Sequence, residues 1–296
     1  MQSPRAAAAV LPDSGAAAAA PPREFAFSKG DFEFLVRLAY ERAGISLSDS
    51  KRNLVYGRLS RRLRALGLTS FAAYRAHLEA DASEIERFIN SISTNHTKFF
   101  RETHHFTHFR SSVAQTFAQQ DQKRAVRRLR VWSAGCSTGE EPYTIALVLR
   151  REITDIARHD VRILATDIDT DVLAKASQGE YAADALESIP DPFCRYFQPA
   201  QESNPPTVKI VHDVRSLITF RRLNLMEAWP MKGPFDAIFC RNVMIYFDGP
   251  TKSKLIERFI RLIKPGGWLY IGHSESLLGS HPGLHLMGRT IYRRDA

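Results

Sequence analysis

The chain has 296 residues, which is enough for one large domain or two modest ones. Its formal net charge of +9 favours an acidic partner, which could be nucleic acid, an anionic membrane surface or an acidic protein. Three scattered cysteines are too few for a disulfide framework or a zinc site, so we expect a cytoplasmic protein without a metal. No stretch approaches the roughly 18 apolar residues of a membrane helix, so we expect no membrane insertion.

The composition changes at Phe25. Residues 1–24 are mostly Ala and Pro, and this composition predicts a disordered leader. From Phe25 onward, apolar residues recur at helical spacing, and the first helix opens with a Ser28–Asp31 pair that resembles a capping box. We therefore expect a small all-helical domain over 25–93. The predicted helices cover 28–44 and about 49–66, and two more begin near Ser70 and near Ser83.

After about residue 128, short apolar runs alternate with helical stretches. This alternation predicts an α/β fold with a parallel, doubly wound sheet. The region of about 190–216 interrupts the alternation with several prolines, and we expect it to be a small inserted subdomain. Residues 284–294 predict a closing hairpin with Gly288 in its turn. The predicted strands are 129–134, 161–167, 217–223, 235–240 and 267–272, and the predicted helices are 142–157, 170–178 and 251–263.

The stretch VWSAGCSTGEEPY, residues 131–143, leads from a strand into a glycine-bearing turn with two carboxylates. Gly135 lets the backbone approach a ligand closely, and the helix that follows offers free N–H groups. The spacing matches neither G-x-G-x-x-G nor G-x-x-x-x-G-K-[ST], and Glu140 and Glu141 would repel phosphates. The turn therefore favours a cationic, phosphate-free ligand, although carboxylates at a helix N-terminus also simply complement the helix dipole.

Asp167 ends the second predicted strand, at the place where acidic residues bind ribose hydroxyls. S-adenosylmethionine carries an ammonium group, a sulfonium group and a ribose diol. It therefore suits both the carboxylates of the turn and Asp167. The sequence predicts an S-adenosylmethionine site formed by Gly135, Asp167 and either Glu140 or Glu141.

Five motifs follow one another along the chain: TNHTKFFRETHHF (94–106), VWSAGCSTGEEPY (131–143), ATDIDTDVL (165–173), FDAIFCRNVMIYFD (235–248) and GHSES (272–276). Together they resemble the chemotaxis receptor glutamate methyltransferases, the CheR family, over about 25–296. The resemblance implies a doubly wound methyltransferase sheet with a small inserted β subdomain, preceded by a small all-α domain. It also implies that 94–128 is an interdomain segment that contributes to the cofactor site, and that 129–296 is the methyltransferase domain.

The activity that the resemblance implies is methyl transfer from S-adenosylmethionine to receptor glutamates, which yields glutamate γ-methyl esters and S-adenosylhomocysteine. Arg101 is expected to pair with the methionine carboxylate, and a glutamate of the turn to hold the ammonium. Arg101 and Tyr246 are candidates for a part in catalysis. The cofactor contacts that the resemblance implies are Asn95, Thr97, Arg101, Gly135, Glu140, Glu141, Asp167, Asn224, Leu225, Arg241 and Asn242.

The acceptor would be a glutamate carboxylate, whose unperturbed pKa of about 4.3 leaves it ionised at neutral pH. It needs no general base, so we expect catalysis mainly by positioning. Two placements stay open. Tyr246 either lines the substrate channel or packs under the sheet, and Leu225 either borders the adenine or belongs to the core.

The segment 51–64 carries six basic residues and no acid, and its apolar residues fall on one arc of a helix. The opposite face, which includes Lys51, Arg58, Arg61, Arg62 and Arg64, is either a plain solvated surface or a docking surface for acidic receptor helices. We expect no nucleic-acid partner. Two other functions remain open, namely a nucleic-acid methyltransferase and a non-catalytic module that senses S-adenosylmethionine.

Overall fold

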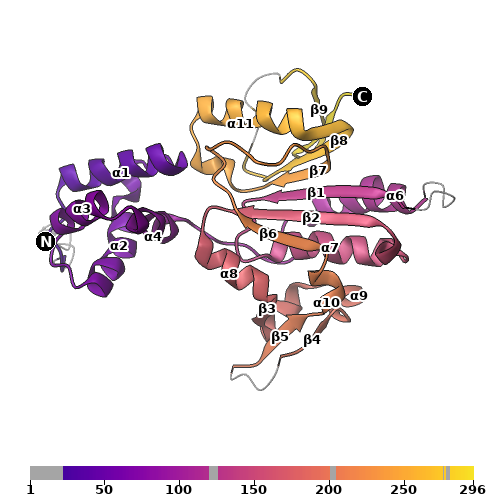
Figure 1. Cartoon of the computed structure of the whole chain (residues 1–296), viewed down its shortest axis with the longest axis horizontal. Coiled ribbons are helices and arrows are strands. Elements are labelled where there is room, and N and C mark those ends of the chain that lie inside the picture. Colours follow the sequence, from indigo (N-terminus) through magenta and orange to yellow (C-terminus); the bar gives the residue numbers. More distant parts are fainter. Residues whose placement is uncertain (1–22, 120–125, 201–204, 276, 278–280) are drawn as a thin grey trace, which may run out of the picture.

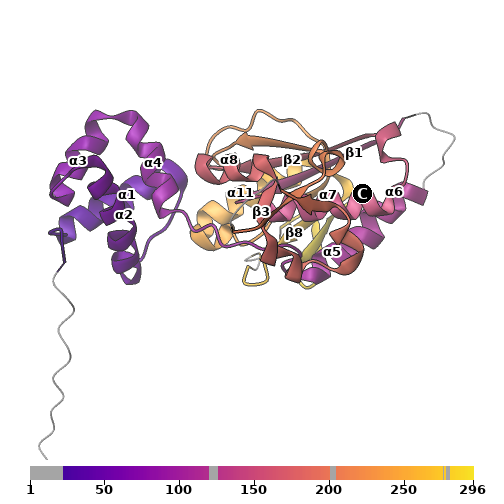
Figure 2. The ribbon, with the colours of Figure 1, turned by 90° about the horizontal axis from the view of Figure 1, so that it is seen from below.

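The computed structural model describes residues 23–119, 126–200, 205–275, 277 and 281–296. Figures 1 and 2 show a helical N-terminal domain beside a larger domain built around a sheet, with one stretch of chain leading from the first to the second. The predicted leader lies outside the described residues, apart from residues 23 and 24. None of the helices in the described ranges combines the length and the apolar character that a membrane span requires.

The N-terminal domain consists of α-helices packed around an apolar core. Its elements are α1 Lys29–Ala43, the short 3₁₀ turn η1 Asp49–Lys51, α2 Arg52–Leu66, α3 Phe71–Ala80 and α4 Ala82–Ile92. Ser28 and Asp31 form the reciprocal capping box at the start of α1, as predicted. Val55, Leu59 and Leu63 are fully buried along one face of α2. The predicted all-helical fold of this region is therefore confirmed.

The segment between the domains is anchored by Phe99 and Phe100. The ring of Phe99 packs edge-on against Tyr181 and Phe197, at centroid distances of 4.9 and 5.6 Å. The ring of Phe100 lies 4.9 Å from that of Phe193. These contacts attach the segment to the larger domain, where it continues into α5 Thr103–Phe109, the π-helical turn η2 Arg110–Gln115 and α6 Thr116–Gln119.

A seven-stranded sheet forms the centre of the larger domain. Its strands are β1 Arg128–Ala134, β2 Asp160–Asp167, β6 Ile218–Arg222, β7 Phe235–Cys240, β8 Ile263–Ile271, β9 Leu284–Gly288 and β10 Ile291–Arg294. They lie in the order β6-β2-β1-β7-β8-β10-β9. The first five of these pair in parallel, and β10 runs antiparallel to both β8 and β9. The predicted α/β fold with a parallel sheet is confirmed. The closing hairpin is confirmed as well, but Gly288 ends β9 and the turn consists of Arg289 and Thr290.

Helices cover both faces of this sheet. They are α7 Glu140–Glu152, α8 Thr170–Gln178 and α11 Gly249–Leu262, with the short turns η3 Ile156–Arg158 and η5 Met244–Tyr246. Figure 1 shows α11 on one face and α7 on the other. The chain passes from β1 to β2 on one side, and β7 joins β1 on the other side. Such a reversal of strand order opens a crevice at the carboxyl ends of the strands, where doubly wound folds bind ligands.

A three-stranded antiparallel sheet is inserted after α8. It has the order β3-β5-β4 and consists of β3 Glu180–Ala182, β4 Phe197–Pro199 and β5 Thr207–Ile210, with the short helical turns η4 Ala183–Ser188, α9 Asp191–Cys194 and α10 His212–Arg215. The small sheet begins at Glu180 and not at about 190 as expected. The prolines that suggested the later boundary follow β3, and this three-residue strand is too short to give a sequence signal of its own.

Candidate functional site

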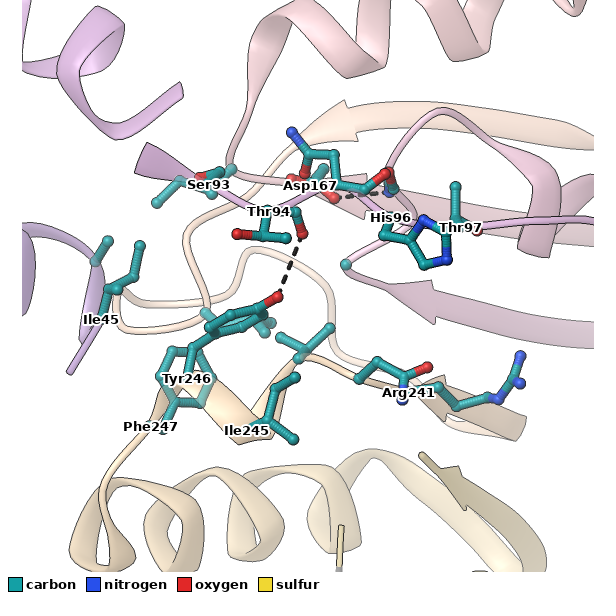
Figure 3. Close-up of a pocket in the computed structure, with 18 of the residues that line it drawn as sticks. Ile45, Ser93, Thr94, His96, Thr97, Asp167, Arg241, Ile245, Tyr246 and Phe247 are labelled. Atoms are coloured by element: carbon teal, nitrogen blue, oxygen red, sulfur yellow. Dashed lines mark hydrogen bonds between the residues drawn. The ribbon is translucent and has the colours of Figure 1, made fainter. Parts of the chain in front are cut away.

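A cavity of about 430 Å³ lies between the two domains, at the carboxyl ends of β1, β2 and β7. This volume is within the range of ligand-binding pockets. Figure 3 shows Ile45 of the N-terminal domain, Thr97 of the interdomain segment, Asp167 and Tyr246 around this space. Segments that are far apart in the sequence thus form one site.

All but one of the predicted binding residues line this cavity. The exception is Glu140, whose carboxylate instead accepts a hydrogen bond from Thr138 Oγ1 at 2.7 Å. Glu141 is therefore the glutamate of the turn that faces the cavity, and Tyr246 also faces it. The predicted residues that the cavity brings together are Asn95, Thr97, Arg101, Gly135, Glu141, Asp167, Asn224, Leu225, Arg241 and Asn242.

The turn after β1 contains three residues with a left-handed backbone, namely Gly135, Ser137 and Gly139. Gly135 has φ 81°, and a Cβ at this position would lie 2.3 Å from Val243 Cγ2, so the close approach of the two loops requires glycine. Ser137 has φ 51°, which is uncommon for a residue with a side chain. Its N–H donates to Asp167 Oδ2 at 2.8 Å, and its hydroxyl donates to the carbonyl of Asn95 at 3.0 Å. These bonds hold the turn between β2 and the interdomain segment.

Asp167 is buried, with 8% of its surface exposed, yet it has hydrogen-bonding capacity left. Besides the bond from Ser137, its Oδ1 accepts the N–H of Asp169 at 3.0 Å. Burial raises the pKa of this carboxyl to about 6, and the two backbone N–H groups oppose the shift without cancelling it. Each carboxylate oxygen has two lone pairs, so both oxygens of Asp167 can accept a further hydrogen bond from a ligand hydroxyl.

The interdomain segment brings polar side chains to the same cavity. Asn95 Nδ2 donates to Asp169 Oδ2 at 2.7 Å, and one guanidinium nitrogen of Arg101 donates to the carbonyl of His96 at 2.8 Å. These partners orient Asn95 and Arg101. A guanidinium has five N–H donors, so Arg101 keeps donors that can bind a carboxylate.

A buried ion pair lies beside the turn. Arg241 is 2.9 Å from Glu141 and 3.4 Å from Glu102, and Glu141 also accepts the Ser133 hydroxyl at 2.7 Å. Burial raises the pKa of Glu141, although Arg241 opposes this shift. At Glu102 burial acts in the same direction, but Arg241 and the N–H of His273 outweigh it and lower the pKa. Glu102, which was not predicted from the sequence, therefore completes a charged network behind the cavity.

Asn224 ties the two domains together. Its side-chain amide donates to the carbonyl of Arg42 at 2.7 Å, and its oxygen accepts the N–H of Met226 at 3.0 Å. Leu225 is 8% exposed, packs with Phe247 in the core and also lines the cavity. The two placements considered for Leu225, core and cavity wall, therefore both apply.

The outer part of the cavity is apolar and basic. Leu54 and Ile245 line it and are 39% and 46% exposed. Lys51, His96 and Lys98 line it as well, and all three are exposed. The carboxylates of the inner part therefore face a rim that carries positive charge.

Tyr246 connects the rim to both neighbouring segments. Its hydroxyl donates to the carbonyl of Thr94 at 3.4 Å, and its own carbonyl accepts the N–H of Ser46 at 2.8 Å. The dashed line in Figure 3 marks the contact with Thr94. Tyr246 thus lies where the N-terminal domain, the interdomain segment and the loop after β7 meet.

Helix α2 uses some of its predicted docking cations within the domain. Arg58 donates to two carbonyls at the end of α4, and Arg62 pairs with the buried Glu84 at 2.5 Å. Arg64 pairs with Glu24 at 2.5 Å. The expectation that these three arginines present free charge is wrong, because their guanidinium groups already bind acceptors of this chain. Among the described residues, Lys51 and Arg61 are exposed and have no side-chain hydrogen bond or ion pair.

The N-terminal domain supplies part of the cavity wall, and this contribution was not predicted from the sequence. The loop after α1 lines the cavity through Ile45, Ser46 and Leu47. Their contacts are with residues far along the chain, such as the bond between Ser46 and Tyr246. A local sequence pattern carries no signal of such contacts.

Comparison with known protein families shows which family this chain belongs to. Residues 95–292 match the family described as CheR methyltransferase, SAM binding domain, and residues 30–93 match its partner, CheR methyltransferase, all-alpha domain. The chain belongs to the CheR methyltransferase family. Its cofactor is S-adenosylmethionine, and the resemblance that the motifs indicated is confirmed.

Curated relatives match nearly the whole CheR chain. Chemotaxis protein methyltransferase 2 of Pseudomonas aeruginosa is 44% identical over 91% of this chain and 95% of its own. The chemotaxis protein methyltransferase of Klebsiella aerogenes is 42% identical over 95% of this chain and 94% of its own. That of Salmonella typhimurium is 42% identical over 91% and 92%. These lengths place both domains of this chain within the similarity.

The polar and apolar groups that line the cavity fit S-adenosylmethionine. Asp167 offers two free acceptor positions to a ribose diol, and the carboxylates of Asp167 and Glu141 in the same cavity suit a ligand with cationic groups. Arg101 keeps donors for the methionine carboxylate. Leu225 and Ile168 supply apolar wall for a base.

Proposed function

We propose that this CheR protein transfers the methyl group of S-adenosylmethionine to side-chain carboxylates of glutamates in chemotaxis receptors. The products are glutamate methyl esters and S-adenosylhomocysteine, and the reaction takes place in the cytoplasm. Membership of the CheR family and the names of the relatives, which are methyltransferases of a chemotaxis protein, support the proposal. The cofactor contacts are proposed to be the predicted residues that line the cavity.

The polarity of the cavity is the observation that carries the proposal. Its inner part presents Asp167 and Glu141, whereas its rim presents Lys51 and Lys98. Carboxylates suit the cationic cofactor, and exposed lysines attract an acidic acceptor. A glutamate side chain that enters past the lysines therefore meets complementary charge along its path.

The chemistry needs little beyond placement. When bound, S-adenosylmethionine supplies a methyl group on a sulfonium, which is a good leaving group. The acceptor carboxylate is already ionised at neutral pH, so no residue has to remove a proton. Tyr246 and Arg101 are proposed to orient the reactants, while Ile45, Ile245 and the ring of Phe247 exclude water from the charged nucleophile.

Receptor docking is proposed for two exposed cations of the N-terminal domain, of which Lys51 lines the cavity. Lys51 and Arg61 lie on η1 and α2 of the N-terminal domain, and both are exposed. They present positive charge to an acidic helix that lies across the cavity mouth. The N-terminal domain would thus dock the receptor while the larger domain holds the cofactor.

A side-by-side methylation assay tests this function. Purified receptor cytoplasmic fragments, tRNA and DNA are each incubated with the protein and methyl-labelled S-adenosylmethionine. We expect label only in the receptor fragment, released as methanol by mild base, because an ester hydrolyses there. Labelled nucleic acid would instead support a nucleic-acid methyltransferase, and cofactor binding without any transfer would support a sensing module.

A further inference from the structure

The loop after β7 supplies Asn242, Val243, Ile245 and Tyr246 to the cavity, although only the short turn η5 gives it regular structure. Asn242 has φ 59°, a left-handed conformation that a residue with a side chain adopts at a cost. Something in the structure must therefore hold this loop in place.

Glu275, which follows β8, provides three bonds to backbone N–H groups around this loop. Its Oε2 accepts the N–H of Asn242 at 2.9 Å and that of Gly272 at 2.5 Å, and its Oε1 accepts the N–H of Ile245 at 3.1 Å. The residue is 5% exposed, and no ion pair with it is found in the described ranges. Burial raises the pKa of Glu275, and the N–H groups oppose the shift by favouring the ionised form.

Gly272 shows how closely these groups are packed. A Cβ at this position would lie 2.7 Å from the backbone nitrogen of Asn242 and 2.7 Å from Glu275 Oε2. Both contacts are too short for a real side chain, so the carboxylate, the loop and the end of β8 are in mutual contact. Asp167 has the same role at the other loop, where it holds the left-handed Ser137 by its N–H.

We infer that Glu275 is a positioning residue for the cofactor site, because its carboxylate fixes the left-handed Asn242 and, through Ile245, the rest of the loop after β7. Glu275 does not line the cavity itself, so it acts through the loop and not by touching the ligand. The inference concerns cofactor binding and does not depend on which acceptor is methylated.

The test is the affinity of the full-length protein for S-adenosylhomocysteine, measured by isothermal titration calorimetry on Glu275→Gln. Glutamine has the same shape, but its amide NH₂ must face either Ile245 or the N–H pair of Asn242 and Gly272. At least one buried N–H then loses its acceptor. We expect binding to weaken about tenfold, as when one charge-assisted bond is lost.

Glu152→Gln is the matched control, because this carboxylate is also largely buried and bonded, but at the far end of α7. If Glu275 had only a structural role, its substitution would lower the melting temperature, as in the control, and would leave the affinity for S-adenosylhomocysteine within twofold of the wild type. That result for folded Glu275→Gln overturns the inference. If Glu275→Gln does not fold, Glu275→Asp decides, because its side chain keeps the charge but is one methylene shorter and cannot reach all three N–H groups. About tenfold weaker binding supports the inference, and wild-type affinity overturns it.

Discussion

The inner end and the rim of the cavity are built in opposite ways. At the inner end, Asp167 is buried and accepts two backbone N–H groups, so its position is fixed by bonds within the fold. At the rim, Lys51 and Lys98 are exposed on long, flexible side chains. Fixed groups bind one ligand in one pose, whereas flexible exposed charges attract a partner at long range and tolerate different approaches. The cofactor end should therefore respond to single atoms, and the rim to ionic strength.

Asp167→Asn gives the largest expected effect. The substitution removes one acceptor from a site that holds both the turn and, as proposed, the ribose, so an unpaired buried N–H adds to the lost ligand bond. We expect affinity for S-adenosylhomocysteine to fall about 100-fold by calorimetry. Asp160→Asn at the exposed start of β2 is the control and should bind normally. Equal affinity of the two variants would remove Asp167 from the site.

The stability of the ligand-free protein should depend on the charge state of Asp167. Its pKa is raised from 3.8 to about 6, so the folded state holds a proton that the unfolded state releases. This group therefore contributes less stability as pH rises from about 4 to about 6, by about 3 kcal/mol in total. In urea unfolding, Asp167→Asn should gain about that much relative to the wild type between pH 4 and pH 7. A constant difference across this range would contradict the raised pKa.

Removal of positive charge from the rim should weaken binding of the receptor fragment and leave cofactor binding unchanged. For Lys51→Gln with Lys98→Gln, we expect the KM for a receptor fragment to rise about three- to tenfold, because exposed charges contribute modestly. Affinity for S-adenosylhomocysteine should stay unchanged. Added salt should mimic the double variant in the wild type. Lys29→Gln on α1, which removes one exposed charge elsewhere, is the control. If cofactor affinity falls as much as acceptor affinity, the division into two ends is wrong.

The smallest effect is expected far from both ends. Ser28→Ala removes the cap of α1, which should cost about 1 kcal/mol of unfolding free energy in urea denaturation. Neither the KM for a receptor fragment nor the affinity for S-adenosylhomocysteine should change. A loss of either affinity would mean that α1 influences the cavity through its packing.

Local patterns in the sequence predicted the features that depend only on residues close together in the chain. The capping box at Ser28, the alternation of strands and helices, and the turn at Gly135 all consist of residues close together in the chain. The motifs of the family then added Asn224 and Arg241, which no spacing rule connects to the turn. Their common cavity is a finding of the structure.

What the sequence could not predict depends on contacts between distant segments. Arg58 reads as a free cation on a helix, but it satisfies carbonyls of α4. Glu140 and Glu141 look alike in sequence, and only the packing around α7 turns Glu141 alone to the cavity. Glu275 lies in the motif GHSES, yet its bond to Asn242 joins positions that only the sheet brings together.

The most direct test of the account is a crystal structure of this protein with S-adenosylhomocysteine. We expect the ribose hydroxyls on Asp167, the turn at Gly135 against the nucleoside, and the sulfur directed toward Tyr246 and the basic rim. A nucleoside bound away from Gly135 and Asp167 would contradict the account.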